Sequence, residues 1–232
     1  MNAKRLIALV CLCAVSLFGG ERNVFYLHTG TSVPLAPEAF RDAYSQGFNV
    51  GLAAGRRLTR SFEVQAMLQL NNAAFDNRGY MNADPDIVAF TDANRADPEV
   101  DIEGGDARVW NLTFNAKLAF PSGSGGKAEP YVMAGAGLFG LRKGKIEIND
   151  YQNQISTTGR VVRPAANETV LGVTAGFGVE VMLDRRSNFF FELAPCIGFT
   201  SGDPTVLVPV KFGISVHGKT AVGIQVTNPD YP

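Results

Sequence analysis

The chain has only two histidines, and they are the first residues to test for chemistry. His28 has a serine, Ser32, four residues later, and His217 lies close to the C-terminal end. A histidine can activate a serine for nucleophilic attack only when a third group, usually a carboxylate, orients the ring. The sequence assigns no carboxylate to this role for either histidine. We therefore predict no catalytic residue and no enzymatic activity.

Cofactor and metal motifs also fail their context tests. The glycine-rich segment AGAGLFG (134–140) lies in a strand-like pattern with no helix after it, whereas a nucleotide-binding glycine loop opens a helix. Clusters of histidine and cysteine are absent from the sequence. The carboxylates of DPEVDIEGGD (97–106) lack the glycine and terminal glutamate of a calcium loop. We predict no cofactor and no metal site.

The segment 73–107 is strongly acidic, and we interpret it as a long solvated loop. Its nine acidic residues against two arginines give a net charge of −7: Asp76, Asp84, Asp86, Asp92, Asp97, Glu99, Asp101, Glu103 and Asp106 against Arg78 and Arg95. Calcium bridging, or binding of a basic external partner, are the alternatives.

The elements that carry these residues are predicted to be strands. In WNLTFNAKLAF (110–120) every second residue is apolar, and Lys117 lies on the other face. This alternation is typical of a β-strand, whose side chains point to opposite faces in turn. Similar runs recur along the chain. Together they predict eight strands, at 23–33, 47–58, 61–72, 110–120, 129–141, 168–183, 189–200 and 206–217.

The connections between these strands alternate between long and short up to the last one. Residues 34–46, 73–107 and 142–167 are long, whereas the links between them are tight turns. Loops of this length are uncommon in compact soluble domains, but transmembrane barrels have short turns at one end and long loops at the other.

Composition limits the remaining possibilities. The chain has 232 residues and a net charge of −1, which does not suggest a nucleic-acid binder. Residues 1–20 combine Lys4 and Arg5 with an apolar run, and we interpret them as a secretory signal peptide. Removal of this segment leaves Cys196 as the only cysteine, so an exported chain would be stabilised without an intrachain disulfide.

The spacing of aromatic rings indicates which face of each strand points outward. Trp110 and Phe120 lie ten residues apart on one face, as do Phe189 and Phe199, and Phe48 and Leu58. Ten residues span about 33 Å, and a strand tilted by about 40° then rises about 25 Å, the height of the apolar band between two aromatic girdles. The predicted girdle residues are Phe48, Phe62, Trp110, Phe120, Phe189 and Phe199.

Charged residues on the opposite face are then expected inside the barrel. Glu63, Lys117, Glu180 and Glu192 each lie near the short-turn end of their strands and are expected at similar depth, with Lys211 further from that end. Buried charges are costly unless they are paired, so we predict one mutually compensating cluster. An eight-stranded barrel is narrow enough for side chains to fill it.

The sequence resembles the small outer-membrane β-barrel proteins of Gram-negative bacteria, the OmpA-transmembrane-domain-like and opacity-protein-like group. The segments that carry the resemblance are 30–59, YVMAGAGLFG (131–140) and VLVPVKFGISV (206–216). In one departure from such barrels, which commonly end on an aromatic residue, residues 218–232 follow the last strand as a tail or an additional strand.

We therefore predict an all-β, eight-stranded antiparallel up-and-down transmembrane barrel over 21–217, in the bacterial outer membrane and monomeric. Its expected role is structural or interactive, with lipid and an external partner at 73–107 as its contacts. The alternatives are a narrow channel for small solutes and a soluble, exported, lipocalin-like ligand-binding barrel.

Overall fold

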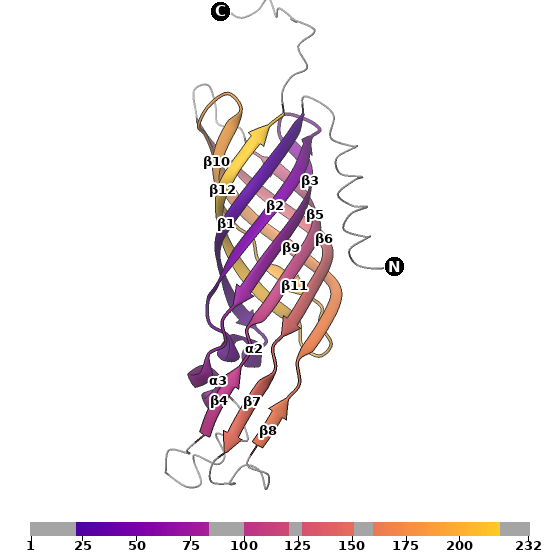
Figure 1. Ribbon diagram of the computed structural model, residues 1–232. Coiled ribbons are helices and arrows are strands. Elements are labelled where there is room, and N and C mark those ends of the chain that lie inside the picture. Colours follow the sequence, from indigo (N-terminus) through magenta and orange to yellow (C-terminus); the bar gives the residue numbers. More distant parts are fainter. Residues whose placement is uncertain (1–21, 84–99, 121–126, 151–159, 219–232) are drawn as a thin grey trace, which may run out of the picture.

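A computed structural model describes residues 22–83, 100–120, 127–150 and 160–218. Eight barrel strands, each antiparallel to the next, form one closed sheet (Figure 1). They are β1 (Asn23–Ala36), β2 (Gly47–Arg57), β3 (Phe62–Ala73), β5 (Ala107–Ala119), β6 (Ala128–Lys143), β9 (Ala166–Met182), β10 (Ser187–Leu193) continued by β11 (Cys196–Gly198), and β12 (Thr205–His217). The predicted fold class is confirmed. The predicted signal segment and the tail after Gly218 lie outside the described residues.

Pairing between the first and last strands closes the barrel. β1 and β12 are in antiparallel register from Val24 opposite His217 to Ala36 opposite Val206. Closure satisfies the backbone donors and acceptors of both strands and leaves the sheet without an edge. A β-sheet must be closed in this way to cross a lipid bilayer.

The barrel strand predicted over 189–200 is interrupted in the middle. β10 ends at Leu193 and β11 begins at Cys196, and both pair with β9 and β12. Pro195 explains the interruption because proline has no backbone N–H to donate to the ladder. The Pro195 carbonyl still accepts a hydrogen bond from the Thr174 hydroxyl at 2.9 Å.

The long connections are more structured than predicted. They contain two short helices, α2 (Glu38–Ala43) and α3 (Asn77–Ala83), and a three-stranded sheet of β4 (Val100–Gly104), β7 (Ile146–Asp150) and β8 (Arg160–Arg163). All five elements lie at one end of the barrel, opposite the end where β1 begins and β12 ends (Figure 1). We call them the extension. Within the described residues, no helix is long and apolar enough to cross a membrane.

The interpretation of 73–107 as a solvated loop was therefore wrong for its described parts. β3 continues to Ala73, and β5 begins at Ala107. Ile102 of β4 and Ile148 of β7 face each other in register and are both buried. Burial of this apolar pair, with Phe40, Tyr44 and other rings of the long connections, explains why these polar segments are ordered. Residues 84–99, which carry five of the nine predicted acids, lie outside the described residues.

The apolar faces of the strands point outward. Leu27, Phe114 and Leu171 are 65%, 63% and 69% exposed, whereas Asn115 and Lys117 on the other face of β5 are each 3% exposed. A water-soluble barrel would bury its apolar face and expose its polar one. The arrangement is the reverse here, and it is the pattern of a barrel surrounded by lipid.

Side chains fill the interior. Towards the extension the filling mixes an apolar group, with Phe139, Cys196 and Leu207 at its centre, with buried amides such as Asn71 and Asn111. The apolar group is continuous with the buried rings of the extension. Gly172 makes room for Phe139, because a Cβ at Gly172 would lie 2.9 Å from the Phe139 Cβ. Towards the short turns the filling consists mainly of charged, tyrosine and methionine side chains.

Candidate functional site: the charged interior and its arginine-lined end

An ion pair between β5 and β9 lies at the centre of the charged interior. The Lys117 ammonium lies 2.5 Å from Glu180 Oε1, and each side chain is 3% exposed. Lys117 Nζ also donates a hydrogen bond to the Tyr26 hydroxyl at 3.2 Å and lies 4.0 Å from the centre of the Tyr131 ring. Two rings and a carboxylate thus replace the water that the ammonium loses on burial.

Glu63 and Arg57 extend this group to β3 and β2. Glu63 Oε1 accepts a hydrogen bond of 2.7 Å from the Tyr26 hydroxyl, and Glu63 Oε2 lies 3.5 Å from Arg57 Nε. Arg57 Nη2 lies 3.4 Å from Glu180 Oε2. The arginine therefore lies between two carboxylates from different strands, at the end of the interior nearest the short turns.

A second ion pair joins β10 and β12. Lys211 Nζ lies 2.8 Å from Glu192 Oε1, and Glu192 Oε2 accepts a 2.9 Å hydrogen bond from the Tyr131 hydroxyl. Tyr131 thus contacts Lys117 through its ring and Glu192 through its hydroxyl. One tyrosine connects the two ion-paired groups.

The charges of the connected set cancel. Three carboxylates (Glu63, Glu180 and Glu192) face three cations (Arg57, Lys117 and Lys211). Because an unpaired buried charge is strongly destabilising, this balance allows the narrow interior to hold six ionised groups. We call these six residues and the two tyrosines the interior charge cluster.

The structure places all five predicted interior charges inside the barrel, but at other relative depths than expected. Lys211, expected further from the short-turn end, is in direct register with Glu192. Glu63 lies directly opposite Lys117 in register, yet the closest carboxylate to Lys117 is Glu180, on a strand that is not its neighbour. Inclined strands bring residues of different sequence offset to one level, which strand-end counting cannot reproduce.

Arg57 and the two tyrosines were missed from the sequence. Arg57 lies two residues after Gly55 and eight after Asn49, so it shares the interior parity of β2. Continuing the alternation to the end of the strand would have found it. Tyr26 and Tyr131 have the interior parity of β1 and β6 in the same way.

The predicted girdle residues lie near the two ends of the strands, and none is buried. Phe62, Phe120 and Phe189 are close to the short turns. Phe48, Trp110 and Phe199 are close to the end that carries the extension. Their exposure is compatible with two rings of aromatic side chains facing the surroundings of the barrel.

Neither histidine lies next to a serine or cysteine nucleophile among the described residues. His28 is buried beside Phe190, and its Nε2 atom has no hydrogen-bond partner among the described residues. The Ser32 hydroxyl donates to Asn71 Oδ1 at 2.7 Å, not to a histidine. His217 Nε2 lies 3.2 Å from Asn188 Nδ2. His28 therefore packs against an aromatic ring, and His217 contacts an asparagine side chain.

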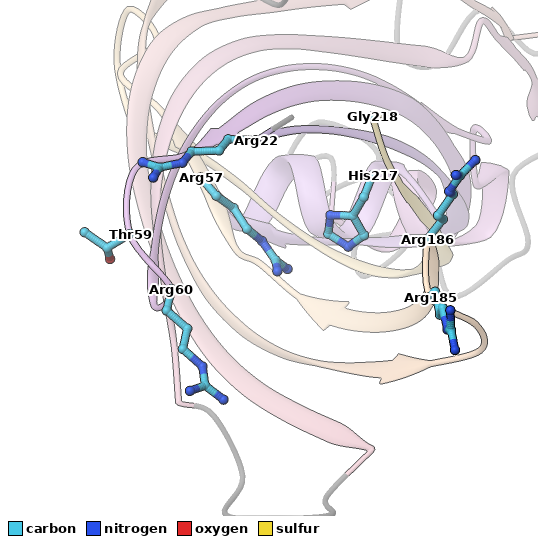
Figure 2. Close-up of a pocket in the computed structure, with 8 residues that line it drawn as sticks. All are labelled: Arg22, Arg57, Thr59, Arg60, Arg185, Arg186, His217 and Gly218. Atoms are coloured by element: carbon cyan, nitrogen blue, oxygen red, sulfur yellow. The ribbon is translucent and has the colours of Figure 1, made fainter. Parts of the chain in front are cut away.

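An open cavity of about 460 Å³ lies at the short-turn end, next to the interior charge cluster. It is lined by Arg22, Arg57, Thr59, Arg60, Arg185, Arg186, His217 and Gly218. In Figure 2 Arg57 and His217 occupy the middle of the opening, Arg22 and Arg60 lie on one side, and Arg185 and Arg186 lie on the other. We call this cavity the arginine pocket. Sequence reasoning missed it because its arginines come from three separate segments.

The fold matches solved outer-membrane barrels. The Neisserial surface protein A aligns over 84% of this chain and 97% of its own, with a TM-score of 0.52 and 10% identity. A major outer membrane protein from Thermus thermophilus aligns over 84% and 99% (TM-score 0.46, 13% identity). The Escherichia coli outer membrane protease OmpT aligns over 86% and 98% (TM-score 0.40, 9% identity).

At 10% identity, the alignment with the Neisserial surface protein A defines the fold and nothing finer. No protein-family model matches the sequence, and no curated protein matches it. The class that the fold defines is the small, closed, eight-stranded outer-membrane type of β-barrel.

Proposed function

We propose that this chain is a bacterial outer-membrane β-barrel whose packed interior does not conduct, and whose extension contacts partners outside the cell. The observation that carries the proposal is the inversion of the barrel: apolar side chains are exposed around the outside, and paired charges are buried within. Burial in lipid removes the cost of that apolar exterior.

The packed interior favours this role over a channel. Interior side chains along the barrel, from Lys211 and Tyr131 to Phe139 and Leu207, are 3% exposed or less. A water-filled lumen would leave such side chains accessible. Single-channel recording in planar bilayers tests the point: we expect no conductance steps, and steady steps that depend on this protein would favour the channel.

The polar interior also argues against a soluble ligand-binding barrel. A lipocalin-like site needs a mostly apolar cavity, whereas here three ion-paired carboxylates occupy the interior. We expect the folded protein to be recovered only with detergent and to migrate differently on gels before and after boiling. Recovery of a folded monomer without detergent would contradict the membrane assignment.

The extension supports a role in surface contacts. Its sheet β4–β7–β8 continues beyond the barrel and exposes Val162 (45% exposed). Exposed strands offer backbone groups and side chains to an incoming partner. In the proposed orientation the short turns face the periplasm and the extension faces outward.

Labelling of single cysteines on intact cells tests this orientation. Cys196 is buried and gives a low background. We expect a membrane-impermeant maleimide to label Val162→Cys on intact cells, and to label Arg185→Cys only after the outer membrane is opened. The opposite pattern would reverse the orientation and place the extension in the periplasm.

A further inference from the structure

The arginine pocket gathers positive charge, and within the described residues Arg57 alone of its arginines is ion-paired with carboxylates. Five guanidinium groups and one imidazole line it, and no carboxylate does. Arg60, Arg185 and Arg186 make no side-chain hydrogen bond or ion pair with any described residue. Like charges held together raise the free energy of the folded protein unless an anion joins them.

Two of the three acidic residues nearby are already engaged. A neighbouring cavity of about 230 Å³ shares Arg57, Arg185 and His217 with the arginine pocket and adds Glu129, Glu180 and Asp184. Glu180 is paired with Lys117, and Asp184 accepts hydrogen bonds from the backbone N–H groups of Arg186 and Ser187 at 2.7 and 2.9 Å. Glu180 also pairs with Arg57 of the pocket, and neither Glu180 nor Asp184 forms an ion pair with Arg185 or Arg186 within the described residues.

The backbone of the chain holds these arginines close together. Arg57 N–H donates to the Arg22 carbonyl at 2.8 Å, and Arg22 Nη1 donates to the Leu58 carbonyl at 3.1 Å. His217 N–H donates to the Arg186 carbonyl at 2.8 Å. Hydrogen bonds between neighbouring segments thus fix the backbone positions of these pocket residues. The barrel therefore holds their side chains close together.

The chemistry of the pocket fits a phosphoryl group. A guanidinium presents two parallel N–H donors that match two oxygens of phosphate, and several arginines can surround one group of this kind. The volume of the arginine pocket, about 460 Å³, falls within the range of small-ligand sites. The arginine pocket therefore has room for a phosphoryl group and for the part of the molecule that carries it.

We propose that the arginine pocket binds a phosphoryl group with two negative charges, carried by a soluble phosphate compound or by a lipid headgroup. This inference goes beyond the proposed function and does not depend on it, because binding can be measured on the folded protein in detergent. The pocket lies at the end of the barrel, where both a dissolved ligand and a headgroup can reach it.

Titration calorimetry with inorganic pyrophosphate on the folded protein in a zwitterionic detergent, at low salt, is the first arm of the test. We expect saturable binding that weakens as salt is added. The second arm uses nanodiscs and compares phosphatidic acid with phosphatidylcholine, read as a shift of the thermal unfolding midpoint. Binding of pyrophosphate identifies a soluble source, and stabilisation only by phosphatidic acid identifies a lipid source. Either result supports a phosphoryl site.

A pair of double variants tests the location. Arg185→Gln/Arg186→Gln removes two pocket charges and leaves the backbone contacts of Asp184 in place. Arg108→Gln/Arg142→Gln removes two charges from exposed residues that are register partners on β5 and β6, at the opposite end of the barrel. We expect the first variant to bind about tenfold more weakly or worse, because it loses charge-assisted hydrogen bonds, and the second to bind like the wild type.

Three results would overturn the proposal. The first is the absence of binding in both arms with a folded barrel, as shown by its gel mobility. The second is equal weakening in the two double variants, which would indicate a general charge effect. The third is citrate binding as tightly as pyrophosphate, which would show that the arginine pocket does not select phosphate.

Discussion

Lys117 on β5 forms its closest ion pair with Glu180 on β9, at 2.5 Å, although Glu63 is its direct register partner on the adjacent β3. The contact crosses the interior to a strand that is not a neighbour of β5 in the sheet. It therefore depends on the curvature of the barrel, which brings side chains of β5 and β9 together across β6.

Loss of the Lys117 ammonium should destabilise the barrel. Lys117→Met leaves Glu180 buried without its closest cation, and removal of one partner of a buried pair costs about 3–5 kcal/mol. The measurement is the free energy of unfolding in urea, with the barrel in detergent or lipid. The matched control is Thr113→Val on the same interior face of β5: Thr113 Oγ1 is buried without a hydrogen-bond partner among the described residues, so its removal should cost little. Equal stability of Lys117→Met and wild type would contradict the cluster.

Gly178 is expected to tolerate no side chain. A Cβ at Gly178 would lie 2.5 Å from the Tyr131 hydroxyl and from the Phe191 carbonyl oxygen. Gly178→Ala should therefore displace Tyr131, weaken its hydrogen bond to Glu192 and cost about 1–3 kcal/mol. Tyr131→Phe separates the two effects, because it removes the hydroxyl without crowding. A stability of Gly178→Ala equal to that of the wild type would show that Tyr131 and the Phe191 backbone both shift without cost.

The depth of an outward residue should determine what a charge there costs. Phe114 lies midway along β5 and is 63% exposed, whereas Leu183 follows the end of β9 and is 60% exposed. In a bilayer, Phe114→Arg should cost about 2–4 kcal/mol and Leu183→Arg about 0–1 kcal/mol. Unfolding in lipid vesicles measures both. Similar costs at the two sites would argue against a bilayer around the barrel.

The β9–β10 turn should lower the pKa of the Asp184 carboxyl below its ordinary value of 3.8. The Ser187 hydroxyl and the N–H of Arg186 donate to the carboxylate and favour its charged form. Because the folded-state pKa is depressed, this contribution to stability is present above the unfolded pKa and is lost as pH falls through the folded one. NMR titration of Asp184 measures the pKa, and Ser187→Ala should raise it. An unchanged pKa in Ser187→Ala would exclude the hydroxyl as the main cause.

The sequence predicts the strands well because strand alternation is a local property. Each run with period two shows where a strand lies and which residues share a face, whatever the strand packs against. The outward face of WNLTFNAKLAF follows from ring spacing in the same way, and the structure exposes Phe114 while it buries Lys117. At Ala194–Pro195 the alternation of buried and outward residues continues, but the hydrogen-bond ladder is interrupted by the proline, which the alternation does not predict. The short strands of the extension carry too few residues to show a period.

The sequence alone therefore determined the eight barrel strands, which residues of each strand point outward or inward, and the presence of buried charge. Only the tertiary structure decided which charges meet: strand register pairs Glu192 with Lys211 and Arg57 with Glu63. The curvature of the barrel brings Glu180 to Lys117 and to Arg57. Closure also brings four segments of the chain together at the arginine pocket. Contacts between residues so far apart in the chain depend on the geometry of the whole barrel, which no local pattern contains.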